Sequence, residues 1–186
     1  MDSEVGLALA KQLEPLCEIT GLTIVEPIYE CQKRRIWDYT YYYCEAILKF
    51  SEELMPYSIL LDKNKRVFQF VPLKSTNNEY LLGYDLLPPG QERQQVLDTV
   101  ERVNATLGNR YFGKGAVQKA EGAYIVSFLA LPEKEIKKRM ERGDLILDPY
   151  FTFFLTEDMT VYGVYCGGWC FSQMEKEGFW KRFLPW

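Results

Sequence analysis

Apolar residues recur at spacings of three and four in two long segments of the chain, and this period predicts two amphipathic helices. The first is expected from Ser3 to a stop at Gly21, and the second over 91–107 with a stop at Gly108. Their apolar stripes are Val5, Leu9, Leu13 and Leu16 in the first helix, and Val96, Leu97, Val100, Val103 and Leu107 in the second. A shorter, charged helix is expected over 133–142, opened by Pro132.

The remaining periodic segments have the character of strands. Residues 37–50 alternate between two faces that both carry apolar side chains, which predicts an interior strand. Residues 123–131 form a continuous apolar run and predict a second interior strand. The other expected strands are an edge or bulged strand over 22–30 broken by Pro27, a weak strand over 110–119, and hairpins over 57–71 and 150–166.

The two hairpins resemble each other at a fixed offset. Leu61 aligns with Leu155, 94 residues later (155 − 61), and the turn and the second arm of each hairpin follow in the same order. Each half then runs helix, strand, strand, hairpin, with an extra short helix in the second half and a linker over 72–90. The pattern leaves open whether this likeness is a true duplication or convergence of two hairpins.

These elements predict an α+β fold with a mainly antiparallel sheet and two principal helices packed on one face. We expect a single compact domain over 1–186, with two candidate repeats of α-β-β-β-β type at 1–75 and 88–170 and an aromatic tail at 171–186. A helix followed by four strands resembles cystatin-like and TATA-binding-like folds, and the resemblance implies only the layer arrangement.

The charge balance bears on the kind of partner. The chain has a formal net charge of −4 and 26% charged residues. Because phosphate contacts dominate binding to nucleic acids, this balance makes DNA or RNA an improbable ligand and suits a basic protein partner. The short basic runs Lys33-Arg34-Arg35 and Lys137-Lys138-Arg139 are interpreted as solvated ends of strands and helices.

The chain contains no histidine. This removes Ser-His-Asp and Cys-His catalysis and histidine-ligated metals. The acidic pairs Glu26/Glu30, Glu52/Glu53 and Glu157/Asp158 fall at expected strand ends or turns. Contact with water there keeps the pKa values of carboxyl groups in their ordinary range, which does not suit acid–base catalysis. No glycine-rich loop opens a helix, so no dinucleotide or phosphate cofactor is expected, and we expect a protein that is not an enzyme.

Five cysteines are scattered along the chain: Cys17, Cys31, Cys44, Cys166 and Cys170. The odd count, and an N-terminal segment without the features of a secretion signal, predict a reducing, cytoplasmic location. The spacing of Cys166 and Cys170 fits neither a redox nor a zinc motif, and we interpret the segment as a glycine turn with buried free thiols and no metal. No apolar stretch approaches the length of a membrane helix.

Aromatic residues make up 15% of the chain. Alternate residues on one strand face lie about 6.6–6.8 Å apart, so the odd positions of 37–43 can form a ladder of rings. Such a ladder either packs beneath a helix, which is the interpretation we favour, or anchors a partner protein. The C-terminal segment either docks on the body of the protein or stays available for binding. The candidate partner-binding residues are Trp37, Tyr39, Tyr41, Tyr43, Trp169 and Trp180.

Residues 150–171 resemble the end of some small bacterial immunity proteins, which also run apolar strand, acidic turn, strand and then a Trp. The likeness covers about an eighth of the chain and implies no site residues. The expected function is a non-catalytic, cytoplasmic binding protein, of the inhibitor, immunity or chaperone-like class, that recognises another protein through an aromatic, acidic face. The alternatives left open are a histidine-independent enzyme using carboxylates, and a structural or assembly subunit that forms a homodimer or larger homo-oligomer.

Overall fold

The computed structural model describes residues 3–36, 39–73, 85–108, 112–120, 122–129, 132–143 and 150–167. The helices are α1 (Ser3–Thr20), α2 (Gln91–Leu107) and α3 (Glu133–Glu141). The strands are β1 (Thr23–Ile36), β2 (Tyr39–Phe50), β3 (Glu53–Leu61), β4 (Val67–Pro72), β5 (Asp85–Leu86), β6 (Phe112–Ala120), β7 (Ala123–Leu129), β8 (Tyr150–Thr156) and β9 (Val161–Cys166).

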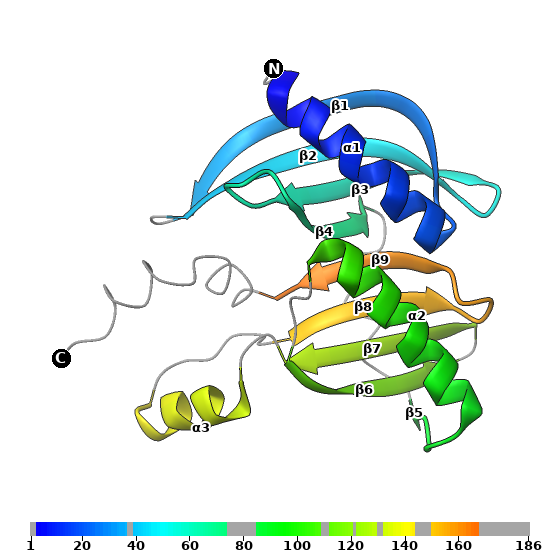
Figure 1. Ribbon diagram of the computed structural model, residues 1–186, viewed down its shortest axis with the longest axis vertical. Coiled ribbons are helices and arrows are strands. Elements are labelled where there is room, and N and C mark those ends of the chain that lie inside the picture. The colour runs from blue at the N-terminus through cyan, green and yellow to red at the C-terminus, as the bar shows by residue number, and fades with distance from the viewer. Residues whose placement is uncertain are drawn as a thin grey trace.

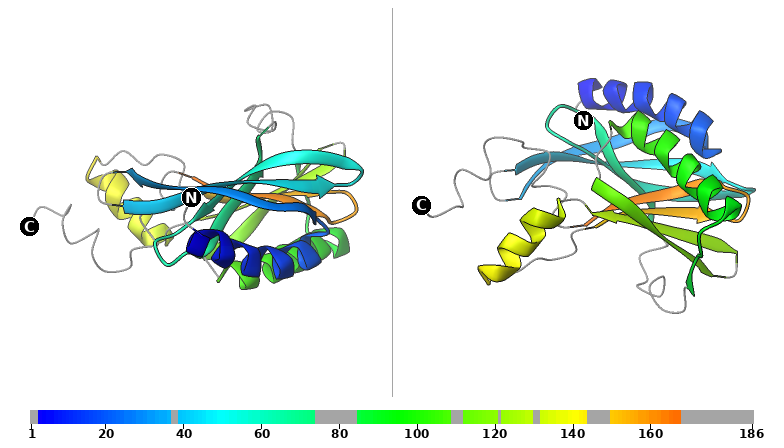
Figure 2. Two further views of the ribbon diagram at one scale, coloured as in Figure 1. Left: turned by 90° about the horizontal axis from the view of Figure 1, so that it is seen from above. Right: turned by 60° about the horizontal axis from the view of Figure 1, so that its bottom comes forward.

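The described strands form one sheet in the order β1-β2-β3-β4-β9-β8-β7-β6-β5, and every neighbouring pair is antiparallel. The last strands of the two halves, β4 and β9, meet in the middle, where Phe70 pairs with Val164. Helices α1 and α2 lie side by side over the same face of the sheet (Figure 1 and Figure 2). The α+β fold with an antiparallel sheet, expected from the sequence, is confirmed.

A single row of paired residues crosses eight of these strands beneath the two helices. Strand pairing brings its members face to face from β1 to β6, and every one of them is buried. The row is Cys31, Cys44, Ile59, Phe70, Val164, Phe153, Val126 and Val117. These side chains share one core with the apolar stripes of α1 and α2. The row therefore identifies the face of the sheet that the helices cover.

Both long helices end as the sequence predicts. Gly21 and Gly108 have φ angles of 75° and 90°, the left-handed conformation that a glycine adopts without a steric penalty.

Inside α1, Gln12 donates from Nε2 to the carbonyl oxygens of Ala8 (2.9 Å) and Lys65 (2.6 Å), and its Oε1 accepts from the Val67 N–H (2.9 Å). The helix is therefore tied to the β3–β4 hairpin by polar contacts as well as by its apolar stripe.

The two hairpins share their turn geometry. In the first, the Lys65 N–H bonds to the Asp62 carbonyl oxygen at 2.8 Å, and in the second the Met159 N–H bonds to that of Thr156 at 3.1 Å. Lys65 and Met159 both have positive φ, and both bonds keep the predicted offset of 94 residues (159 − 65 and 156 − 62). The central pair of Phe70 and Val164 keeps it too (164 − 70), so the halves meet as equivalent surfaces do in a two-fold dimer. Duplication and the limits 1–75 and 88–170 stay predictions.

Some elements differ from those expected. Strand β1 continues to Ile36, so the basic run Lys33-Arg34-Arg35 lies inside a strand rather than at its end. Its register shifts fall between Ile24 and Glu30, around Pro27, in agreement with the predicted edge and bulge. Strand β3 begins at Glu53, and the two-residue strand β5 lies in the segment expected to be a linker.

Candidate interaction surface

The structure describes part of the predicted partner-binding set. Trp37, Trp169 and Trp180 lie outside the described residues, as does the whole of the segment 171–186. Tyr39 begins β2, but its side chain also falls outside the description. Tyr41 and Tyr43 are described in full, and the candidate surface is therefore built around them.

Tyr41 and Tyr43 point to the face of the sheet opposite the helices. Their neighbour Cys44 belongs to the buried row beneath α1 and α2, and successive side chains in a strand point to opposite faces. The expectation that these rings pack beneath a helix is wrong for this pair, because the helices cover the even positions of β2. The rings are half-buried and pack against the edge of the core.

Strand pairing extends this face into a strip. We define the β2 strip as Tyr41, Tyr43, Glu45, Ile47 and Lys49 of β2, with Arg34 opposite Tyr41 on β1 and Leu54 opposite Lys49 on β3. Ile47 and Leu54 expose 39% and 60% of their surface. Leu60, which pairs with Tyr43 and shares its face of the sheet, is buried. The strip therefore presents apolar and aromatic groups to solvent on a firmly packed base.

Two charged groups hold the Tyr43 ring. Its hydroxyl donates to Oε1 of Glu45 at 2.7 Å, and the Arg34 guanidinium lies 4.8 Å from the ring centroid. Arg34 also donates to Oε1 of Gln32 at 3.2 Å. Partial burial and then Glu45 raise the pKa of Tyr43, while a hydrogen bond with Ser58 and the charge of Arg34 oppose that rise. The Glu45 hydrogen bond and the Arg34 guanidinium hold the ring in place, so Tyr43 acts as a fixed platform.

The charge of the β2 strip is mixed. Its charged side chains are Arg34 and Lys49, which are basic, and Glu45, which is acidic. Lys49 forms an exposed ion pair with Glu52 at 2.9 Å. The acidity of the whole chain is therefore not concentrated among these side chains, and the strip itself does not favour a basic partner.

A second polar cluster joins α2 to the sheet. Glu92, in the first turn of α2, accepts hydrogen bonds at Oε1 from Nζ of Lys119 (2.5 Å) and from the hydroxyl of Tyr124 (2.6 Å). Lys119 lowers the pKa of Glu92, and Tyr124 lowers it further; Glu92 in turn raises the pKa of Lys119. Burial, followed by Glu92, raises the pKa of Tyr124. The carboxylate is stabilised by the helix N-terminus as well, so the cluster anchors α2 and offers no free acid or base.

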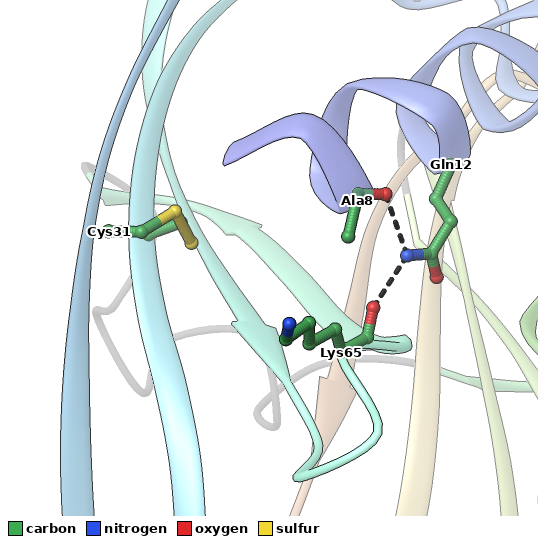
Figure 3. Close-up of a disulfide and its surroundings, with 5 residues drawn as sticks. Ala8, Gln12, Cys31 and Lys65 are labelled. Carbon is green, nitrogen blue, oxygen red and sulfur yellow. Dashed lines mark hydrogen bonds between the residues drawn. A yellow bond between two sulfur atoms is a disulfide. The ribbon is translucent and has the colours of Figure 1, made fainter. Parts of the chain in front are cut away.

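The cysteines differ from the expectation of free thiols. Cys31 and Cys44 face each other across β1 and β2 and form a disulfide with a Cα–Cα distance of 4.1 Å (Figure 3). Cys166 is disulfide-bonded as well. Cys17 is the free cysteine of the described chain, and burial in α1 raises its pKa to about 11. The prediction of unpaired thiols at Cys166 is wrong. Disulfides form and persist mainly in oxidising environments, so these bonds do not support the predicted reducing compartment.

The acidic pairs considered for acid–base work are placed as follows. Glu52 and Glu53 are exposed at the β2–β3 turn, and Glu157 and Asp158 are exposed at the β8–β9 turn. Hydrogen bonds from Thr156 and then Thr160 lower the pKa of Asp158. The side chains of Glu26 and Glu30 fall outside the description. Within the described residues, no three cysteine or carboxylate side chains gather in a way that would hold a metal ion.

Comparison with known proteins adds no assignment. No protein-family description, no curated protein sequence and no solved structure matches this chain. In the described part of the chain, no helix is both long enough and apolar enough to span a bilayer. The fold and the surfaces above therefore carry the functional argument alone.

Proposed function

We propose that this protein binds another protein without catalysing a reaction, and that the β2 strip contributes the contact surface. The observation that carries the proposal is the row of half-buried Tyr41 and Tyr43 with exposed Ile47 on the sheet face opposite the helices. Aromatic anchors with a polar surround are typical of protein interfaces.

The rigidity of the strip supports this role. The Tyr43 ring is held between Arg34 and Glu45, and the buried row lies directly beneath the strand. A ring fixed before binding loses little conformational freedom when the partner arrives. We keep an inhibitor, immunity or chaperone-like role as the finer proposal, supported by the resemblance of residues 150–171 and by the lack of histidine.

The test is affinity capture from an extract of the source cells, with the tagged protein as bait and quantitative mass spectrometry as the readout. The variant Tyr41→Ala/Tyr43→Ala should lose a partner that the wild type retains. The matched control, Leu7→Ala/Met140→Ala, removes two exposed apolar side chains from the helices and should retain it. A partner held equally by all three proteins would show that the strip is not the contact surface.

A further inference from the structure

No described strand pairs with the outer edge of β1, and part of this edge is regular. Among the described strands β1 pairs only with β2, and it stands at the end of the sheet. The register is unbroken from Glu30 to Ile36, and the side chains from Gln32 to Arg35 are exposed to solvent. Figure 1 shows this part of the β1–β2 ribbon reaching past the end of α1.

The direction of the backbone groups follows from one distance. The Cα atoms of Cys31 and Cys44 are 4.1 Å apart, which matches a non-hydrogen-bonded antiparallel pair (about 4.5 Å) rather than a hydrogen-bonded one (about 5.5 Å). Residues of a non-hydrogen-bonded pair direct their N–H and C=O groups away from the partner strand. By alternation, Cys31, Lys33 and Arg35 direct theirs outward, whereas Gln32 and Arg34 bond to β2.

Charge rather than shape protects this part of the edge. Natural sheets block their edges with bulges, prolines or charged residues. The bulges and Pro27 of β1 lie before Cys31, so beyond it the basic run Lys33-Arg34-Arg35 is the remaining device. Such a run repels a second copy of the same edge but attracts a chain of opposite charge. Lys33 and Arg35 lie on one face of the sheet and Arg34 on the other, so acidic residues on either face of an added strand would meet a cation.

We propose that the β1 edge from Cys31 to Arg35 binds an extended acidic segment of a partner protein by strand addition. Backbone hydrogen bonds supply the affinity and the three cations select the charge of the segment. The Cys31–Cys44 disulfide holds β1 against β2 at this level, so that the edge keeps its register. This goes beyond the proposed function, because it depends on backbone groups and cations and would stand if the tyrosines of the β2 strip proved inert.

The first experiment uses fluorescence anisotropy with three labelled peptides of about ten residues, the length of a typical long strand. One is rich in Glu, Asp, Val and Thr; the second has the same sequence with alternate backbone amides N-methylated; the third replaces each acidic residue with Lys. The acidic peptide should bind, the methylated one should bind at least about tenfold more weakly because it cannot complete the backbone ladder, and the basic one should not bind. Equal binding of the first two peptides, or no binding of the first, would overturn the proposal.

The second experiment varies the protein. Lys33→Glu/Arg35→Glu should weaken the acidic peptide at least about tenfold, while the control Lys134→Glu/Arg142→Glu makes the same change of charge at exposed positions near α3 and should not. Lys33→Pro should bind more weakly than Lys33→Ala, since proline is tolerated where the N–H faces solvent but removes that donor. Circular dichroism checks that each variant is folded.

Two further measurements separate this proposal from binding through the β2 strip and from self-association through the edge. Ile47→Ala/Leu54→Ala removes exposed side chains of the β2 strip and leaves the Tyr43 ring beside Arg34 in place. This variant should bind the acidic peptide normally, so a failure of the β2 strip as a contact surface is distinguishable from a failure of the edge. A wild-type dimer in light scattering that is abolished by Lys33→Pro would show that a second copy occupies the edge, and would overturn the proposal.

Discussion

Replacing the Cys31–Cys44 disulfide with a pair of valines tests how the sheet is held together at its β1 edge. In the row beneath the helices, the disulfide occupies the same place in the first half that Val117 and Val126 occupy in the second. The second half therefore shows that an apolar cross-strand pair can close the row without a covalent bond. We expect Cys31→Val/Cys44→Val to keep the fold and to lose the constraint that the bond places on the unfolded chain.

The size of the loss follows from the loop that the bond closes. Cys31 and Cys44 are 13 residues apart, which corresponds to about 3 kcal/mol of unfolding free energy in the chain-entropy description. The valines keep the buried apolar volume, whereas Cys31→Ala/Cys44→Ala removes the equivalent of four further methyl groups. At about 0.8 kcal/mol for each, the alanine pair should be less stable than the valine pair by about 3 kcal/mol.

Urea unfolding followed by intrinsic fluorescence and circular dichroism, with and without a thiol reductant, measures both differences. Because Cys166 is also disulfide-bonded, the valine variant shows how much of the reductant's effect does not come from the β1–β2 bond. The reductant should lower the midpoint of the wild type more than that of the variant. Equal oxidised stabilities of the wild type and the valine variant, or a valine variant with no cooperative transition, would refute the reasoning.

Three further outcomes are expected. Gly115→Ala should destabilise the protein by about 1–3 kcal/mol, because the new Cβ would lie 2.6 Å from the buried Phe128 ring. Gly6→Ala should stabilise it by about 1 kcal/mol, because the new Cβ has open space around it and alanine favours the helix. Equal urea midpoints of the two variants would contradict this. The pKa of Glu92 is lowered in the fold, so its stabilising effect is complete above the ordinary carboxyl pKa of 4.5 and is lost as the pH falls through the lowered value; the stabilities of wild type and Glu92→Gln should converge in acid, and a constant gap would be inconsistent with this. Cys17, with a pKa of about 11, should react with a thiol reagent at pH 8 only after unfolding, and prompt labelling of the native protein would rule out its burial.

The helices and the interior strands were predictable from the sequence because their patterns are local. The stripe of α1, its stop at Gly21 and the apolar run of β7 each lie within one window of the chain, where period and turn residues decide the element. The continuation of β1 through Lys33-Arg34-Arg35 was missed because exposed residues of an edge strand carry no alternation. That segment is a strand because it pairs with β2, and its own composition does not indicate this.

The candidate surface was only partly predictable, because it depends on which face of β2 the helices cover. Both faces of 37–50 carry apolar side chains, so one strand cannot reveal that α1 and α2 choose the side of Cys44 and leave Tyr41 and Tyr43 opposite. The disulfide was equally out of reach, since cysteine spacing does not determine which pairs face each other across strands. The register of strand pairing determines both the exposed face of β2 and the disulfide pair.

The meeting of β4 and β9 at the centre has a consequence for how copies of this protein can associate. Because the final strands of both halves are consumed internally, the outer margins of the described sheet are the long β1 and the two-residue β5, which are very unequal. Two molecules that joined margin to margin would use up both long ones and leave only the short ones outside. Association through the β1 edges therefore stops at a dimer and does not continue into a fibre. The like charges of Lys33, Arg34 and Arg35 oppose even the formation of that dimer.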